Sequence, residues 1–180
     1  MKFIVKLYPE IMMKSKPVRM RFTKMLETNI RNVLKKVDED AKVQRQWDRI
    51  MVMVPKDKPE LAQAFGERLA CIPGIAHVVQ VDEYSFESVD DIYQQVLPVY
   101  RDQLAGKTFC VRVKRTGDHD FNSIEVERYV GGGLNQFTDA LGVRLKNPDI
   151  TVNLEIERDN LYVVTKRIEG LGGFPMATQE

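Results

Sequence analysis

A run of basic residues in the middle of the chain carries the clearest chemistry in the sequence. Residues 107–115 read Lys-Thr-Phe-Cys-Val-Arg-Val-Lys-Arg and hold four positive charges and no acid. Alternating apolar and polar residues predict a strand over 108–113, and on a strand Arg112 and Lys114 stand on one face about 7 Å apart. That spacing is close to the phosphate repeat of a nucleic-acid strand, and both side chains are donors suited to phosphate. The run therefore indicates an anionic partner, although a solvated outer face gives the same pattern.

A second basic surface is expected on a long helix near the N-terminus. Apolar residues recur at three- and four-residue steps between Val18 and Val37, which predicts an amphipathic helix beginning around Ser15-Lys16-Pro17. The side opposite the apolar stripe carries a basic stripe of Arg21, Lys24, Arg31 and Lys35. Many surface helices are rich in Lys and Arg, so this stripe also fits simple solvation. Together with Lys2 and Lys6 on the opening strand, it makes three basic surfaces in a chain of almost neutral charge.

The sequence contains no arrangement that assembles a catalytic site. Its two histidines, His77 and His119, and its two cysteines, Cys71 and Cys110, are too far apart to give metal-ligand spacing. No phosphate-binding loop of the Gly-x-x-x-x-Gly-Lys-[Ser/Thr] type occurs, because Gly170–Gly173 lacks the lysine and the helix that must follow. We therefore expect a binding protein rather than a catalytic unit, with no metal or cofactor in this chain.

Composition and charge narrow the class of protein. The chain has 180 residues, 43% hydrophobic and 29% charged, which is ordinary for a globular protein and excludes a disordered or fibrous one. The net charge is only +1, but residues 1–36 hold ten Lys or Arg against two acids, while residues 37–106 hold seven against thirteen. Two cysteines cannot form a disulfide framework, and no apolar run has the length of a signal peptide or membrane helix. We expect a soluble cytoplasmic protein that does not bind membranes.

The order of elements predicts an α+β protein of two domains. Up to residue 81 the expected order is strand 2–8, the basic helix, strands 43–47 and 50–54 as a hairpin, helix 60–69 and strand 75–81. This is the βαββαβ order of a ferredoxin-like domain. An acidic stretch, Asp82 to Asp91, marks the boundary.

The second domain is expected to mix helices and strands in the same way. Its predicted elements are a helix over 89–104, the basic strand 108–113, a helix from the capping box Asn122-Ser123-Ile124-Glu125 toward Ala140, and a hairpin of strands 151–156 and 162–165. Gly131-Gly132-Gly133 interrupts the second helix, where each Gly costs roughly 1 kcal/mol relative to Ala. The chain then ends in a glycine-rich stretch that is expected to be flexible and turn-prone.

These residues resemble a known family. Phe109 to Arg115, followed by Phe121-Asn122-Ser123, Glu127 and Gly131–Gly133, looks like the THUMP domain of RNA-modifying enzymes. The opening strand and the stretch Glu10 to Ser15 before the basic helix are similar to the N-terminal ferredoxin-like domain of the tRNA 4-thiouridine synthetase family. The resemblance covers nearly the whole chain. It implies a ferredoxin-like domain over 1–81, an RNA-binding THUMP domain over 82–168, and a linker over 169–180 toward a catalytic domain.

The chain departs from the family pattern in two places. Pro9 and Ser15 stand where many relatives have glycines, so the loop after the first strand can differ in shape. The family's adenylating domain, with its Ser-Gly-Gly-x-Asp-Ser motif and its ATP, is not found within residues 1–180, nor is a rhodanese-like domain with a persulfide cysteine. The resemblance thus implies the tRNA-recognition part of an ATP-dependent tRNA sulfurtransferase that also supplies sulfur for thiamine thiazole synthesis. It further implies a cysteine desulfurase as sulfur donor.

The resemblance also implies how the two domains act. In the family they hold the acceptor stem and the unpaired 3′ end of tRNA, so that the distance from this end to the target uridine places the base in the catalytic site. Phosphate contacts suit such positioning because they carry little sequence information, and unpaired bases offer faces for stacking. The candidate RNA-binding residues are Lys107, Arg112, Lys114, Arg115, Arg21, Lys24 and Phe121. For Phe121 a place in the core is an equal alternative, and the triple glycine fits either a close approach of RNA or the packing of its own helix.

Two other functions remain open at this point. One is a THUMP module of another tRNA-modifying enzyme, such as a methyltransferase, although the ferredoxin-like opening argues against it. The other is a ferredoxin-like regulatory module for a small metabolite or a protein, which is supported by the fold pattern alone. The sequence does not decide tRNA preference, the angle between the domains, whether the molecule forms a homodimer, or whether residue 180 is a natural end.

Overall fold

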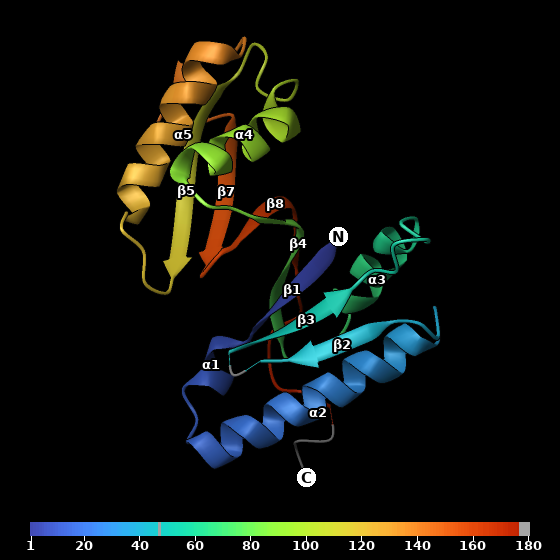
Figure 1. Ribbon diagram of the computed structural model, residues 1–180. Coiled ribbons are helices and arrows are strands. Elements are labelled where there is room, and N and C mark those ends of the chain that lie inside the picture. The colour runs from blue at the N-terminus through green and yellow to red at the C-terminus, as the bar shows by residue number, and fades with distance from the viewer. Residues whose placement is uncertain (47, 177–180) are drawn as a thin grey trace. The chain divides into compact units, whose positions relative to one another are not determined.

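The computed structural model describes residues 1–46 and 48–176. The chain forms two compact units (Figure 1): unit 1 contains residues 1–81 and the segment from Thr165 onward, and unit 2 contains residues 82–164. Trp47 of the expected hairpin and residues 177–180 of the expected linker lie outside the described part of the chain. No helix among the described residues combines the length and apolar character needed to cross a bilayer.

Unit 1 has the ferredoxin-like order of elements. These are β1 (Lys2–Leu7), α1 (Pro9–Met12), α2 (Lys16–Lys35), β2 (Lys42–Arg45), β3 (Arg49–Met53), α3 (Leu61–Leu69) and the first part of β4 (Ile75–Ser85). The strands lie in the order β2-β3-β1-β4, and every neighbouring pair is antiparallel. The two longer helices, α2 and α3, both pack against this sheet. The expected α+β class and ferredoxin-like fold are confirmed.

The core of unit 1 forms where the apolar face of α2 packs against the apolar face of the sheet. On α2 the buried apolar side chains are Phe22, Leu26, Ile30 and Leu34, spaced by four residues. Leu26, Ile30 and Leu34 pack in one cluster with β1 side chains such as Phe3 and Val5. Burial of each such side chain contributes about 1.5–3 kcal/mol, which fixes which face of α2 points away from water.

The alternation of residues 2–8 predicts a half-buried first strand with Lys2 and Lys6 on its outer face, and this prediction is wrong at the centre of the strand. Ile4 has no exposed surface, although it points away from the Phe3 and Val5 side. Its register neighbours on either side, Met51 of β3 and Val79 of β4, are buried as well. β1 is a central strand, so apolar residues on both adjacent strands shield this face too, which one strand's alternation does not reveal.

The glycine-rich tail, expected to be flexible, packs on unit 1 over its described part. The Gly170 amide donates to the Ala76 carbonyl (3.0 Å), and the Gly172 amide donates to the Ile75 carbonyl (2.7 Å). A Cβ on Gly170 would collide with the carbonyl oxygen of Ile75, so only glycine allows this approach. Farther along, Phe174 lies against the ring of Phe22, with centroids 5.6 Å apart. The glycines here permit close backbone contact.

Unit 2 combines two helices with a mixed sheet. Besides the end of β4, its elements are α4 (Val89–Tyr100), β5 (Thr108–Thr116), α5 (Ser123–Phe137), β6 (Gly142–Val143), β7 (Ile150–Glu157) and the first part of β8 (Asn160–Glu169). Its strands lie in the order β8-β7-β5-β6, with β5 parallel to both of its neighbours and β7 antiparallel to β8. The expected hairpin of the last two strands is confirmed, whereas the short edge strand β6 was not expected.

Local signals position both helices of unit 2. Ser88 caps α4 by accepting a hydrogen bond from the Asp91 amide (3.1 Å). Asn122 caps α5 by accepting one from the Glu125 amide (2.8 Å), as the sequence predicts. The two helices end a few residues earlier than expected. Their apolar faces cover the inward side chains of β5, which leaves the other face of that strand for a different role.

The triple glycine lies inside α5 and serves helix packing at one of its three positions. A Cβ on Gly133 would come within 2.5 Å of the buried ring of Tyr93 on α4. A Cβ on Gly131 would make only an ordinary contact with Val111, and one on Gly132 would meet nothing within 4 Å. Gly133 therefore sets the close approach of α5 to α4, which supports the packing interpretation at that position.

Candidate nucleic-acid interface

The outward face of β5 carries two exposed cations. Phe109, Val111 and Val113 are buried beneath the helices, and the alternation of the strand turns Arg112 and Lys114 to the opposite face. Both are exposed, and among the described residues neither forms an ion pair. The expectation that these two side chains share one accessible face is therefore met by the geometry.

The segment after α5 adds cations to the same edge of the sheet. Val143 of β6 lies in register with Phe109 of β5, so its side chain points to the helix side. The next residue, Arg144, lies just beyond β6 and is exposed. The Arg144 amide donates to the Phe109 carbonyl (2.8 Å), and Arg112 Nη2 donates to the Leu145 carbonyl (3.2 Å), which ties this segment to β5.

We call this region the β5–β6 surface. Its cations are Lys107, Arg112, Lys114, Arg144 and Lys146, all exposed, and the exposed apolar residues Leu141, Val143 and Leu145 lie in the same segment of chain as Arg144 and Lys146. Cations can neutralise phosphates, and exposed apolar side chains can lie against unstacked bases. Arg144, Lys146 and their apolar neighbours are not among the site residues predicted from the sequence. The alternation of apolar and basic residues over 141–146 is the strand signal that would have found them.

Asp149 fastens the end of this segment to the start of β5. Its carboxylate accepts hydrogen bonds from the Thr108 amide (2.9 Å) and the Thr108 hydroxyl (3.1 Å). These bonds, the backbone one first, lower the pKa of Asp149 below its ordinary value of 3.8, and Lys107 and Arg144 act in the same direction. The acid therefore organises the cationic segment while it is ionised.

We expect Asp149→Asn to lower the melting temperature at pH 7, and to lower it less at pH 3. Because folding lowers the pKa of this carboxyl, its stabilising contribution is complete above pH 3.8 and is lost as the pH falls below that value. The measurement is the difference in melting temperature between the parent chain and the variant at both pH values. Asp102→Asn, at an exposed carboxylate without a hydrogen bond among the described residues, is the control. A difference for Asp149→Asn that stays constant with pH would contradict this role.

Arg115 and Phe121 serve the structure of their own loop. Arg115 is half-buried, its Nη1 donates to the Gly117 carbonyl (2.8 Å) and lies 2.9 Å from Nδ1 of His119. The His119 ring stacks on Phe121 with centroids 4.8 Å apart, and Phe121 packs on the core of unit 2. Arg115 is thus held by the loop rather than free on the face of Arg112, and the core alternative describes Phe121 better. Because side chains alternate along β5, Arg115 lies on the opposite face from Arg112, and closure of the following loop fixes Arg115 and Phe121 in place.

In unit 1, only part of the predicted basic stripe of α2 is available to a ligand. Arg21 and Lys24 are exposed on the outer side of α2, as predicted. Arg31, in contrast, bonds Glu27 at 2.7 Å, so part of the basic stripe is neutralised within the helix. Within residues 1–46 and 48–176, the stripe therefore contains one cation in an ion pair, Arg31, and three that form none.

A cavity among the loops of unit 2 is lined mainly by acidic and polar residues. It has a volume of about 610 Å³ and is lined by the loop residues around His119, with Asp118, Asp120 and Asp159 among them. No group of His, Cys, Asp or Glu within the described residues has an arrangement that could hold a metal ion. The carboxylates that line this cavity would repel phosphate. We therefore place the nucleic-acid interface on the β5–β6 surface.

Comparisons with known proteins match two successive stretches of the chain to two domain families. Residues 2–79 match the ThiI ferredoxin-like domain, and residues 86–166 match the THUMP domain. The whole chain is 99% identical to part of a tRNA sulfurtransferase of Shewanella baltica and 94% identical to part of one from Shewanella oneidensis. In both cases it spans only 37% of the length of the relative.

Solved structures show the same fold. PH1313 from Pyrococcus horikoshii is 27% identical, with a TM-score of 0.82 over 98% of this chain and 58% of that one. A 4-thiouridine synthetase solved with RNA and ATP is 24% identical, with a TM-score of 0.75 over 98% of this chain and 43% of that one. The chain therefore contains a ThiI ferredoxin-like domain followed by a THUMP domain, and over its whole length it is similar to the corresponding part of tRNA sulfurtransferases.

Proposed function

We propose that this chain is the tRNA-binding part of a tRNA sulfurtransferase and holds the acceptor stem and the 3′ end of its substrate. The observation that carries the proposal is the β5–β6 surface, a group of five exposed cations within the THUMP domain, with exposed Leu141, Val143 and Leu145 in the same segment of chain as two of the cations. The cations suit a phosphate backbone, and the apolar side chains suit unpaired terminal bases rather than a closed duplex. The names of its relatives favour tRNA over other nucleic acids.

The chemistry of sulfur transfer is proposed for the longer protein and not for these residues. The curated relatives extend well beyond the part that this chain matches. We propose that the remainder uses ATP to activate a uridine and receives sulfur from a cysteine desulfurase, and that the sulfur also serves thiamine thiazole synthesis. A cytoplasmic location fits an enzyme that acts on tRNA.

The test is a titration of the chain with whole tRNA and with tRNA trimmed of its unpaired 3′ end. We expect micromolar binding of whole tRNA, falling about 40-fold or more between 50 and 200 mM salt when three or more phosphates are contacted. Trimming should weaken binding at both salt concentrations, because the apolar side chains lose their bases. Filter binding or gel shift gives both affinities.

Two outcomes would contradict the proposal. Binding that does not depend on salt would exclude a phosphate-contacting surface. Equal affinity for whole and trimmed tRNA would leave a backbone-binding protein that does not recognise the 3′ end.

A further inference from the structure

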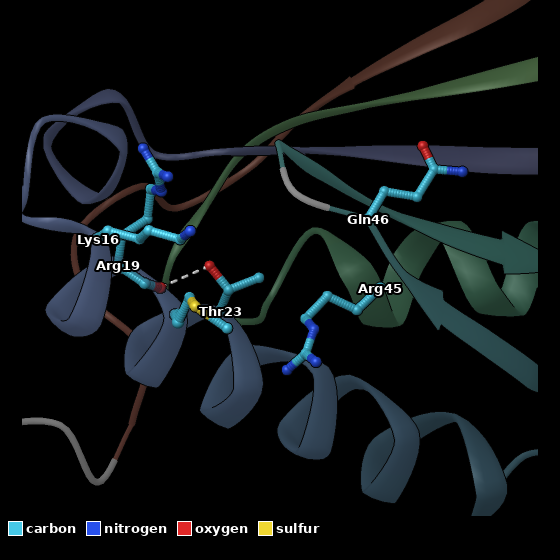
Figure 2. A pocket seen from close by; sticks show the side chains of 6 residues that line it. Lys16, Arg19, Thr23, Arg45 and Gln46 are labelled. Carbon is cyan, nitrogen blue, oxygen red and sulfur yellow. Dashed lines mark hydrogen bonds between the residues drawn. The ribbon is translucent and has the colours of Figure 1, made fainter.

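A cavity in unit 1 is lined by cations that are not among the RNA-binding residues predicted from the sequence. It lies between the first turns of α2 and the end of β2, has a volume of about 330 Å³, and is lined by Lys16, Arg19, Met20, Thr23, Arg45 and Gln46. This volume is within the range of small-ligand sites. Figure 2 shows Lys16, Arg19 and Thr23 on the first turns of α2, with Arg45 reaching toward the helix from β2. Two separate elements thus direct positive charge at one hollow.

The charges around the cavity leave it strongly positive. Among the described residues, Lys16 and Arg19 form no ion pair. Arg45 lies 3.7 Å from Glu27, which is beyond ordinary hydrogen-bond distance, and Glu27 is already bonded by Arg31 at 2.7 Å. Since Arg31 satisfies this carboxylate, Arg45 remains available to a stronger anion.

The walls of the cavity are fixed rather than loose. Thr23 is 4% exposed, and its hydroxyl donates to the Arg19 carbonyl at 2.7 Å. On the strand side, Gln46 accepts a hydrogen bond from Arg49 Nε at 3.0 Å. A preformed hollow with guanidinium donors is suited to a phosphate group, because a planar guanidinium can donate two hydrogen bonds to phosphate oxygens.

The helix itself gains nothing from these cations. The first turn of α2 contains no acid, and it places Lys16 and Arg19 at the end where the helix dipole disfavours positive charge. Local helix stability would favour Asp or Glu at these positions. Residues that oppose local stability are expected where they serve a binding site.

We propose that Lys16, Arg19 and Arg45 bind backbone phosphates of the tRNA, making this cavity a second contact on unit 1. The proposal rests on the proposed function and extends it, because it assigns the contact to the cavity between α2 and β2 instead of the outer face with Arg21 and Lys24. The bound group is a phosphodiester of the backbone, so the contact positions the tRNA without reading its sequence.

The experiment compares two variants of α2 that remove the same charge. Lys16→Gln with Arg19→Gln empties the cavity of two cations, whereas Lys35→Gln with Lys36→Gln removes two exposed cations at the other end of the helix. For the cavity variant we expect about tenfold weaker tRNA binding and a salt slope that is smaller by about one. The Lys35 and Lys36 variant should keep the salt slope of the parent. The exchange Lys16→Arg with Arg19→Lys should show the parent slope as well, because it retains both charges.

Melting temperature provides the check on folding. The cavity variant should melt at the parent temperature or above, because it removes cations from the positive end of the helix dipole. Loss of binding together with a lower melting temperature would overturn the proposal, since disrupted packing would then explain the loss.

The remaining outcomes separate this proposal from the proposed function. If the parent chain shows no salt-dependent tRNA binding, the proposed function fails. If the parent binds and the cavity variant behaves like the control, only the cavity assignment fails. Inorganic phosphate, compared with chloride at equal ionic strength, gives the last arm. A phosphate-induced rise in the melting temperature of the parent, absent from a cavity variant whose tRNA affinity is unchanged, would reassign the cavity to a small free phosphate and overturn its role in tRNA binding.

Discussion

Reversing Arg112 and Lys114 together to Glu is expected to weaken tRNA binding by about 2–4 kcal/mol, roughly 30- to 1000-fold. Both side chains are exposed on one face of β5, so the variant removes two phosphate contacts and adds repulsion at the same place. The slope of binding against salt should fall by about two, because each lost phosphate contact lowers it by about one. Filter binding against whole tRNA at four or more salt concentrations measures both quantities.

The control is the double reversal Arg101→Glu with Arg128→Glu. These cations are also exposed, but Arg101 follows α4 and Arg128 lies on α5, in the helical layer. The change in net charge is the same, so a nonspecific effect of charge would weaken both variants equally. Equal loss in the two variants would remove Arg112 and Lys114 from the interface.

Adding one methyl group at two adjacent glycines of α5 should change stability in opposite directions. Gly133→Ala places a Cβ against the ring of Tyr93, and we expect a net loss of about 1–2 kcal/mol after the gain in helix propensity. Gly132→Ala meets nothing within 4 Å and should stabilise the chain by about 0.5–1 kcal/mol. Melting temperatures of the two variants should differ by about 5 °C or more.

The two variants control each other, since they share the same chemical change and neighbouring positions in one helix. The Tyr93 ring cannot easily move aside, because it is 6% exposed and packs edge-on against Tyr129, with centroids 6.3 Å apart. If Gly133→Ala melts at or above the parent temperature, α5 is not held close to α4 by this glycine. Since α5 also covers β5, a destabilised variant should lose tRNA affinity in proportion to the fraction that is unfolded.

The elements that could be predicted from the sequence are those whose signals are local. The four-residue spacing from Phe22 to Leu34 predicts α2 and its buried face, and Asn122 predicts the start of α5 through its cap. The alternation in β5 predicts which side Arg112 and Lys114 take. In each case the pattern is complete within one short stretch of chain, so residues from other elements are not needed to predict it.

Elements that depend on neighbouring strands could not be predicted in this way. The burial of Ile4 requires Met51 and Val79 beside it, and β6 exists only because Val143 finds a register partner in Phe109. The fixed position of Phe174 likewise requires Phe22, which is distant in sequence. Such pairings are set by the assembled sheet and not by local preference.

The sequence by itself determined the two-domain α+β organisation, the resemblance to a tRNA-binding family and the cationic face of β5. Only the tertiary structure decided which cations are available to a ligand: it commits Arg115 to its loop and Arg31 to Glu27, it joins the segment that carries Arg144 to Arg112, and it places Arg45 at the cavity lined by Lys16 and Arg19. The physical reason is that a charge is available only if folding leaves it exposed and not hydrogen-bonded to an opposite charge. That condition depends on residues from other elements, which sequence spacing does not reveal.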